Sequence, residues 1–279
     1  MSKFLFYILC FCLLFLSCEE ENLNDIAGNQ FVIEAFLFAG EPVDDIRIKS
    51  TFPLIDTEDT SAPINDAQVT LIKGSQDYLL VRSGDEGYYN YPGTDLRVTT
   101  GDVFQLEVTY NGITATAETI VPTPTEGLTL SLDSLKIPTL PFSQGRDSIV
   151  AALQDFVGNS RIEARWRNPE RDLYYMTVES VSDSIIPIFP DVVISALERF
   201  RFVSEPTDES SLDFLGGSLV SFGQYAVKVY HINQEYAALY ENRNQDSRDL
   251  NEPPSNVFNA LGVFSAFNSQ EAFFEVARE

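Results

Sequence analysis

The stretch that decides the fold is residues 103–121, "VFQLEVTYNGITATAETIV", in which two alternating runs flank Asn111-Gly112. Apolar side chains recur at every second position of both runs: Phe104, Leu106, Val108 and Tyr110, then Ile113, Ala115 and Ala117. A period of two is typical of a half-buried strand. Asn-Gly suits a type I′ turn, because both central residues of that turn need a positive φ. The stretch therefore predicts an antiparallel hairpin with one buried face.

The same kind of sequence continues on the N-terminal side of this hairpin. Residues 31–38, "FVIEAFLF", predict a buried strand, and residues 44–50, "DDIRIKS", alternate apolar with charged side chains. Residues 62–102 show strands and turns without a helical period. Many short strands at intervals of about 8–12 residues favour a β-sandwich. Because the two prolines and the glycine of "VPTPTEG" (121–127) interrupt the pattern, we predict an N-terminal β-sandwich over residues 30–122.

The C-terminal part, residues 126–279, is also β-rich. Its predicted strands are "RIEARW" (161–166), "DLYYMTVES" (172–180), "GQYAVKVYHI" (223–232) and two closing strands, "GVFSAF" (262–267) and "EAFFEV" (271–276). A helix is expected over residues 233–242, with Asn233 as its cap. The predicted fold class is therefore mainly β, with two immunoglobulin-like or transthyretin-like β-sandwich domains, the second carrying one or two short helices.

The N-terminus has the features of a signal peptide. Lys3 is followed by the uncharged run "FLFYILCFCLLFL" (4–16), which is shorter than the roughly 20 residues that span a bilayer. A positive start, a short apolar run and a small residue before a cut predict that residues 1–17 are removed. Cys10 and Cys12 would leave with them, so Cys18 would be the only thiol and the mature chain would form no internal disulfide. The acidic and polar residues 18–29 are expected to form a tether.

The "FLSC" stretch ending at Cys18 resembles the end of a bacterial lipoprotein signal peptide, in which the cysteine after a small residue takes a diacylglycerol. The resemblance implies that Cys18 is a lipid attachment site that holds the protein to membrane lipid. The glutamates at 19–21 are similar to the signal that directs some lipoproteins to the outer face of the outer membrane. We therefore expect an outer-membrane location facing the cell exterior; a secreted protein or a simple transmembrane anchor is the alternative.

Composition limits the partners. The formal net charge is -24, from 18 basic and 42 acidic residues, so nucleic acid should be repelled. Hydrophobic residues make up 44% of the chain, which is enough to form a buried core. We therefore expect a folded protein and not a globally disordered one.

Sequence motifs for catalysis are missing, and we expect no catalytic, metal-binding or cofactor-binding residue and no cofactor. His231 is the one histidine, and no Gly-x-Ser-x-Gly elbow occurs. Acidic pairs such as Asp44-Asp45 and Asp85-Glu86 leave open a surface hydrolase of glycans or peptides. The acidic loop 56–66 leaves calcium binding open.

Three tyrosines are candidates for ligand contact. Tyr88, Tyr89 and Tyr91 lie in a Gly- and Pro-bounded stretch and could stack on a sugar or touch a protein. Neighbouring residues of a strand point to opposite faces, so part of this set is expected in the core.

The order of several segments resembles the domain-of-unknown-function 4249 family of lipoproteins. These segments are "FVIEAFLF", "INDAQVTLI", "GYYNYPG", "TAETIVP", "WRNPERDLYYMTVE" and "EPPSNVFNALGVFSAF". Where the family pattern has Asn-Ile-x-Gly-Gly before Gly-Val-Phe, this chain has "NVFNAL". The resemblance implies genetic proximity to TonB-dependent outer-membrane receptors. We therefore expect a non-enzymatic binding or accessory component of nutrient uptake, with a hydrolase or a structural, adhesive surface protein as alternatives.

Overall fold

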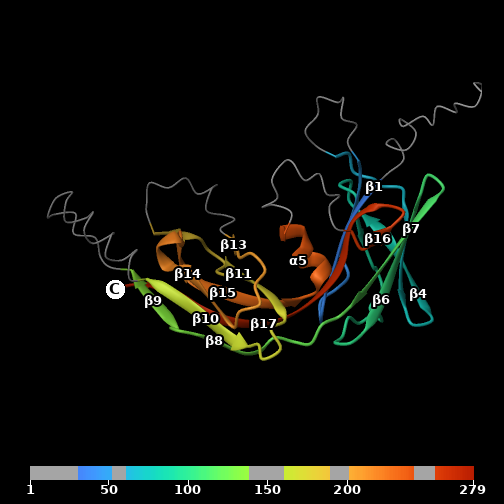
Figure 1. The fold of residues 1–279 in the computed structure, drawn as a ribbon. Helices are drawn as coiled ribbons and strands as arrows, with labels where there is room; N and C mark the ends of the chain where they lie inside the picture. The colour runs from blue at the N-terminus through green and yellow to red at the C-terminus, as the bar shows by residue number, and fades with distance from the viewer. Residues whose placement is uncertain (1–30, 52–60, 138–159, 189–200, 242–254) are drawn as a thin grey trace, which may run out of the picture.

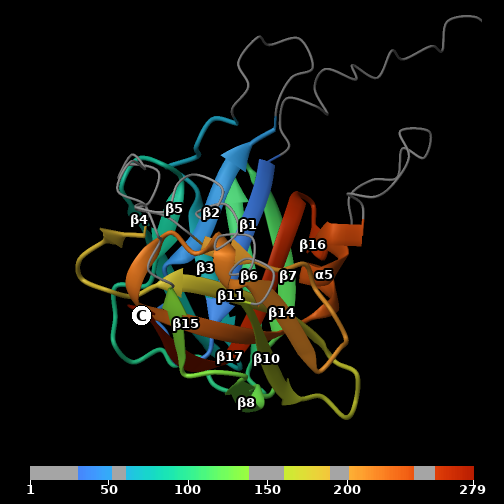
Figure 2. The same cartoon turned by 90° about the vertical axis from the view of Figure 1, so that its left-hand side faces the viewer.

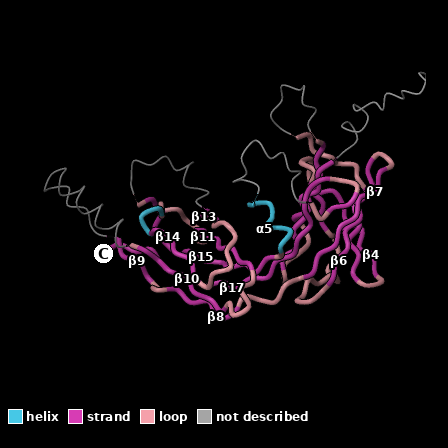
Figure 3. Tube along the Cα trace, in the orientation of Figure 1, coloured by secondary structure: helices cyan, strands magenta, loops and turns pink. Residues whose placement is uncertain are grey.

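The computed structural model describes residues 31–51, 61–137, 160–188, 201–241 and 255–279. These residues form two lobes that share one long strand (Figure 1). The predicted signal peptide, the tether, Cys18 and part of the acidic loop 56–66 lie outside the described residues. The prediction of a mainly β fold built from two sandwiches is confirmed (Figure 3).

The first lobe contains the strands that precede residue 121 and one short strand from near the C-terminus. They are β1 (Phe31–Phe38), β2 (Asp45–Ser50), β3 (Gln68–Lys73), β4 (Gln76–Ser83), β5 (Tyr88–Asn90), β6 (Val103–Tyr110), β7 (Ile113–Ile120) and β16 (Val257–Phe258). The second lobe contains β8 (Glu126–Leu130), β9 (Ser134–Ile137), β10 (Arg161–Arg167), β11 (Leu173–Ser180), β12 (Ile186–Pro187), β13 (Arg201–Val203), β14 (Ser211–Leu215), the 3-10 turn η3 (Gly216–Ser218), β15 (Ser221–Ile232) and α5 (Gln234–Glu241). The shared strand is β17 (Leu261–Arg278).

The hairpin predicted from residues 103–121 is confirmed. β6 and β7 pair antiparallel from Val103 opposite Ile120 to Tyr110 opposite Ile113. Asn111 and Gly112 have φ values of 48° and 79°, as a type I′ turn requires. The alternate apolar side chains of both strands enter the core of the first lobe.

The shared strand joins both lobes into one sheet, in the order β13-β11-β15-β17-β1-β2-β5-β4-β3-β6-β7-β16. The first part of β17, residues 261–267, pairs parallel with β1, and Figure 2 shows the two strands side by side. Residues 267–276 pair antiparallel with β15. Both predicted closing strands are confirmed as parts of the single strand β17, because the polar residues between them continue the ladder instead of forming a turn.

Each lobe has its own hydrophobic core. In the second lobe, the large sheet packs on a small sheet ordered β14-β10-β8. The first core includes Val257, Phe264 and Ala266 beside residues of β1 to β7. The C-terminal segment, which the sequence assigns to the second domain, thus also completes the interior of the first.

The connector between the lobes, residues 121–127, is held by hydrogen bonds. Thr125 Oγ1 donates to the carbonyl of Val229 at 2.8 Å, and Asn268 Nδ2 donates to the carbonyl of Pro122 at 3.0 Å. Gln270 Oε1 accepts a hydrogen bond of 2.9 Å from the amide of Leu128 just beyond the connector. The stretch that the prolines mark as a boundary is therefore attached to β15 and β17 along its length.

The predicted helix is confirmed as α5, which lies over an aromatic cluster at the junction of the lobes (Figure 1). The carbonyl of Asn233 accepts from the amides of Tyr236 and Ala237, which places Asn233 at the cap position. Its side-chain Nδ2 donates to the carbonyl of Ile120 in β7 at 2.8 Å. Among the helices of the described residues, none is long and apolar enough to span a membrane.

Candidate binding surface

The surface that we single out is the outer face of the first lobe, defined as the outward side chains of β4, β3, β6, β7 and β16. These strands are neighbours in the sheet and lie on the side of the first lobe away from the second (Figure 1). The pairing registers place one row of residues across them: Phe258, Thr116, Glu107, Thr70 and Leu79. The intervening residues of the same strands point inward and form the core.

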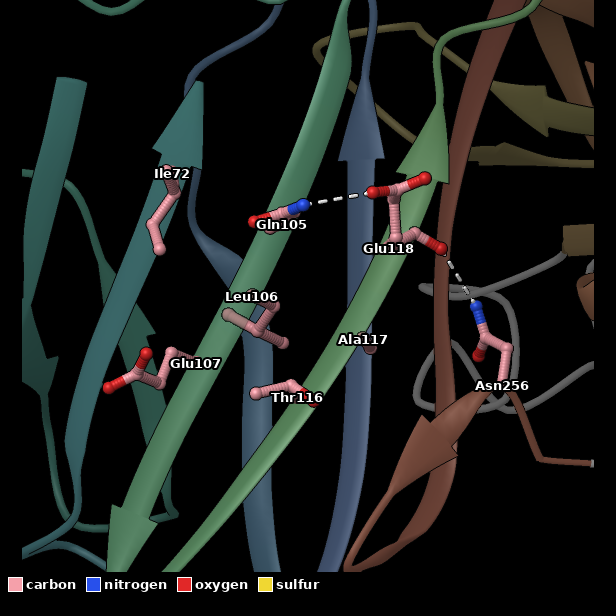
Figure 4. A pocket seen from close by; sticks show the side chains of 8 residues that line it. All are labelled: Ile72, Gln105, Leu106, Glu107, Thr116, Ala117, Glu118 and Asn256. Carbon is pink, nitrogen blue, oxygen red and sulfur yellow. Dashed lines mark hydrogen bonds between the residues drawn. The ribbon is translucent and has the colours of Figure 1, made fainter. Parts of the chain in front are cut away.

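A hollow of about 410 Å³ lies in this face (Figure 4). Its lining side chains come from β3, β6, β7 and the residue before β16: Ile72, Gln105, Leu106, Glu107, Thr116, Ala117, Glu118 and Asn256. Gln105 Nε2 donates to Glu118 Oε2 at 3.0 Å, so the amide and carboxylate are fixed relative to each other. The hollow offers carboxylate and amide oxygens above an apolar floor.

Asn256 at the rim of the hollow closes the first lobe. Its Nδ2 donates to the carbonyl of Glu118 in β7 at 3.2 Å and to the carbonyl of Phe264 in β17 at 2.7 Å. Its Oδ1 accepts from the amide of Phe264 at 3.0 Å. One side chain therefore bridges β7 and β17, beside the hydrogen bond that the amide of Ala266 donates to Thr119 Oγ1.

The three candidate tyrosines do not form a single platform. Tyr89 is buried, and its hydroxyl donates to the carbonyl of Ile64 and accepts from the amide of Ala67. The Tyr88 ring lies under the guanidinium of Arg47, 4.9 Å from its centroid. Tyr91 packs edge-on against Tyr78 and donates its hydroxyl to Asp95.

Of the acidic pairs, Asp44-Asp45 has the more unusual environment. Burial raises the pKa of Asp45, and the neighbouring carboxylates of Asp44 and Glu34 raise it further, against a lowering by Arg201. Asp85 instead lies in an exposed turn, where its carboxylate is 3.4 Å from the Arg82 guanidinium.

His231 belongs to the junction of the lobes. Its Nδ1 is 2.8 Å from the carbonyl of Thr123 in the connector, and its ring stacks on Tyr174 at a centroid distance of 4.8 Å. These two contacts indicate that His231 has a structural role in packing. Within the described ranges, no group of three or more histidine, cysteine, aspartate or glutamate side chains is arranged to hold a metal ion.

Sequence reasoning missed the outer face as a site, because its residues are ordinary strand residues. The only available signal was an apolar residue at an outward position, such as Leu79 in β4 or Val103 in β6.

The fold and this surface define a two-lobed β-sandwich protein with an open sheet face. The chain belongs to the family described as "Domain of unknown function (DUF4249)", whose model matches residues 19–272. Membership of this family, expected from the order of the sequence segments, is thereby confirmed. A search of curated proteins finds no match to the sequence.

Solved structures with local likeness are tandem β-sandwich proteins. A two-domain fibronectin type III segment of chicken tenascin has 9% identity and a TM-score of 0.25, covering 88% of this chain and 99% of that one. A three-domain segment of titin has 12% identity and a TM-score of 0.21, covering 74% and 62%. The chicken CNTN1 fibronectin segment has 13% identity and a TM-score of 0.27, covering 73% and 61%.

Proposed function

We propose that this protein is a lipid-anchored binding protein on the outer face of the outer membrane, where it assists a TonB-dependent receptor in nutrient uptake without catalysing a reaction. The observation that carries the proposal is the shared strand β17, which pairs with both lobes and makes them one frame. Such a frame, held by an acylated Cys18 and an acidic tether, suits a protein that presents a fixed surface to a partner.

The anchor is tested by metabolic labelling with an alkyne-tagged palmitate. We expect the wild-type protein to carry the label and to sediment with outer membranes, and we expect Cys18→Ser to lose both properties. An unlabelled wild-type protein that fractionates away from the envelope would contradict the anchor and the location together.

The partner is tested by purification from outer membranes solubilised in mild detergent. A TonB-dependent receptor should co-purify with the wild-type protein, and deletion of the gene should slow uptake of that receptor's substrate. A protein that elutes alone, in a strain whose uptake is unchanged by the deletion, would rule out the accessory role.

A second candidate is a surface hydrolase, and the environment of Asp45 favours it. A carboxyl group whose pKa is raised by burial and by neighbouring carboxylates can stay protonated closer to neutral pH, as a general acid must. A panel of glycans and peptides tests this function with Asp45→Asn and the turn variant Asp85→Asn as its matched control. Turnover lost in the first variant alone would support the hydrolase, and no turnover by the wild type would end it.

A further inference from the structure

We propose that the outer face of the first lobe docks a partner protein whose contact surface has apolar side chains framed by lysine and arginine. This proposal rests on the proposed function only for the identity of the partner.

The first support is the exposure of large apolar side chains on the outer face. Antiparallel sheets with one wet face usually carry polar side chains on that face. Here Phe258 is 70% exposed, Leu79 57% and Ile120 52%. With Val81 and Val103, the outer face holds five of the ten exposed large hydrophobic residues found in the described ranges. Exposed apolar side chains that gather in one area mark interaction sites.

The second support is that these side chains surround the hollow. Val103 and Ile120 are directly paired and lie two residues along their strands from Gln105 and Glu118 in the hollow. Phe258 and Leu79 occupy the two ends of the row that crosses it through Thr116 and Glu107. Figure 4 shows the residues that line the hollow, including the hydrogen-bonded Gln105 and Glu118.

The third support is charge. Asp77, Glu107 and Glu118 lie on the outer face, and the described residues place no lysine or arginine in ion-pair contact with any of them. Nearby Lys73 is already bound to Asp102 and to the carbonyl of Arg97. Uncompensated carboxylates favour a basic partner and oppose a second copy of this chain, whose net charge is -24.

Side chains already occupy the hydrogen-bonding edge of β7, and this limits how a partner can bind. Side-chain amides cover the carbonyls that β16 leaves free: Asn259 at Thr114, Asn256 at Glu118 and Asn233 at Ile120. An added strand would have to displace these hydrogen bonds. The partner is therefore expected to lie on the face of the sheet and not to extend it.

Site-specific photocrosslinking tests the proposal in cells that make the full chain. A benzophenone amino acid replaces Phe258 on the outer face or, as a matched control, the exposed Phe273 of β17 in the second lobe. We expect a heavier adduct from position 258 and at least about tenfold less from position 273, because contact at the outer face is specific. Equal adducts from both positions, or an adduct that is a dimer of this chain, would overturn the proposal.

Charge reversal then tests the chemistry of the partner. Glu107→Lys with Glu118→Lys should lower the adduct at position 258 by about tenfold or more, because like charges would face each other. Glu271→Lys with Glu275→Lys, on exposed positions of the second lobe, changes net charge equally and should leave the adduct unchanged. Thermal unfolding of each variant shows that it is folded, and mass spectrometry should place the crosslink in a partner peptide flanked by lysine or arginine. An adduct that is insensitive to the first pair would contradict a basic partner.

The outcomes separate this inference from the proposed function. If a receptor co-purifies equally well with the Glu107 and Glu118 variant and position 258 gives no adduct, the docking surface is wrong and the function stands. If the charge-dependent adduct contains another protein and no receptor is found, the accessory role is wrong and the docking surface stands.

Discussion

Asn259 lies in the turn between β16 and β17 with a φ of 62°. This left-handed conformation is unfavourable for most side chains, but asparagine and glycine adopt it readily. Asn259 therefore supports the left-handed turn without a glycine. Asn259 Nδ2 also donates to the carbonyl of Thr114 at 3.1 Å.

We predict that Asn259→Gly changes the free energy of unfolding little, because relief of backbone strain offsets the lost hydrogen bond. Asn259→Val should lower it by about 1–3 kcal/mol, because a β-branched residue is strained at positive φ. Urea unfolding of both variants measures the difference. Equal losses in the two variants would show that the hydrogen bond, and not the backbone conformation, sets the stability of this turn.

Asp102 gives a prediction for pH. Burial alone would raise its pKa, but hydrogen bonds from Lys73 and Thr99 lower the pKa below its usual value. A depressed pKa in the folded state adds stability above the unfolded-state pKa, and this stability is lost as the pH falls through the folded-state value. Asp102→Asn should therefore destabilise the protein near neutral pH by about 1–2 kcal/mol and have progressively less effect in acid. Urea unfolding between pH 7 and pH 3 checks this; a constant difference would contradict it.

At the level of single residues, the sequence predicted burial well where alternation was regular. It predicted that part of the tyrosine set would be core, which Tyr89 confirms. It could not predict the role of Asn256, because the three hydrogen bonds of that side chain depend on strands that meet only in the folded molecule.

Among the elements, β17 shows where local patterns mislead. "NSQ" at 268–270 separates two apolar runs and resembles a turn. In the structure, Asn268 instead donates a hydrogen bond to the connector. Gln270 accepts one from the amide of Leu128 in β8. Parallel pairing of β1 with β17 has no local sequence signal, because the two strands come from opposite ends of the described chain.

Asn256 allows the closure of the first lobe to be measured. Asn256→Ala removes one side-chain hydrogen bond to β7 and two to β17, and should lower the free energy of unfolding by about 1–3 kcal/mol. Gln105→Ala, in the same hollow but exposed, should change it by less than about 0.5 kcal/mol. Hydrogen exchange should show faster opening of β7 in the first variant only. Similar stability of the two variants would mean that β16 and the hydrogen bonds of Thr119 and Asn259 are enough to close the lobe.

For the whole molecule, the shared strand predicts cooperative unfolding. Residues of β17 belong to the cores of both lobes, so unfolding of one lobe that releases β17 also exposes the core of the other. Differential scanning calorimetry should therefore show one transition. Replacing both Asn268 and Gln270 with alanine should broaden or divide that transition, because it weakens the connector. Two resolved transitions in the wild type would show that the lobes unfold independently despite the common strand.

The mainly β fold with two sandwiches could be read from strand spacing. The pairing of β16 and β17 with strands of the first lobe could not be predicted from the sequence. Turn residues mark where a strand ends, but they do not show which strand lies beside it. The outer face was missed for the same reason: its continuity across strands arises from register.

The side-by-side position of β1 and the start of β17 also sets the order of folding events during synthesis. A nascent chain that has released everything up to the connector still lacks residues 261–267, the partner of its own first strand. The edge of β1 that faces β17 therefore stays unpaired until residues 261–267 have been made. Closure of the first lobe therefore depends on residues that the ribosome adds more than 200 positions after β1.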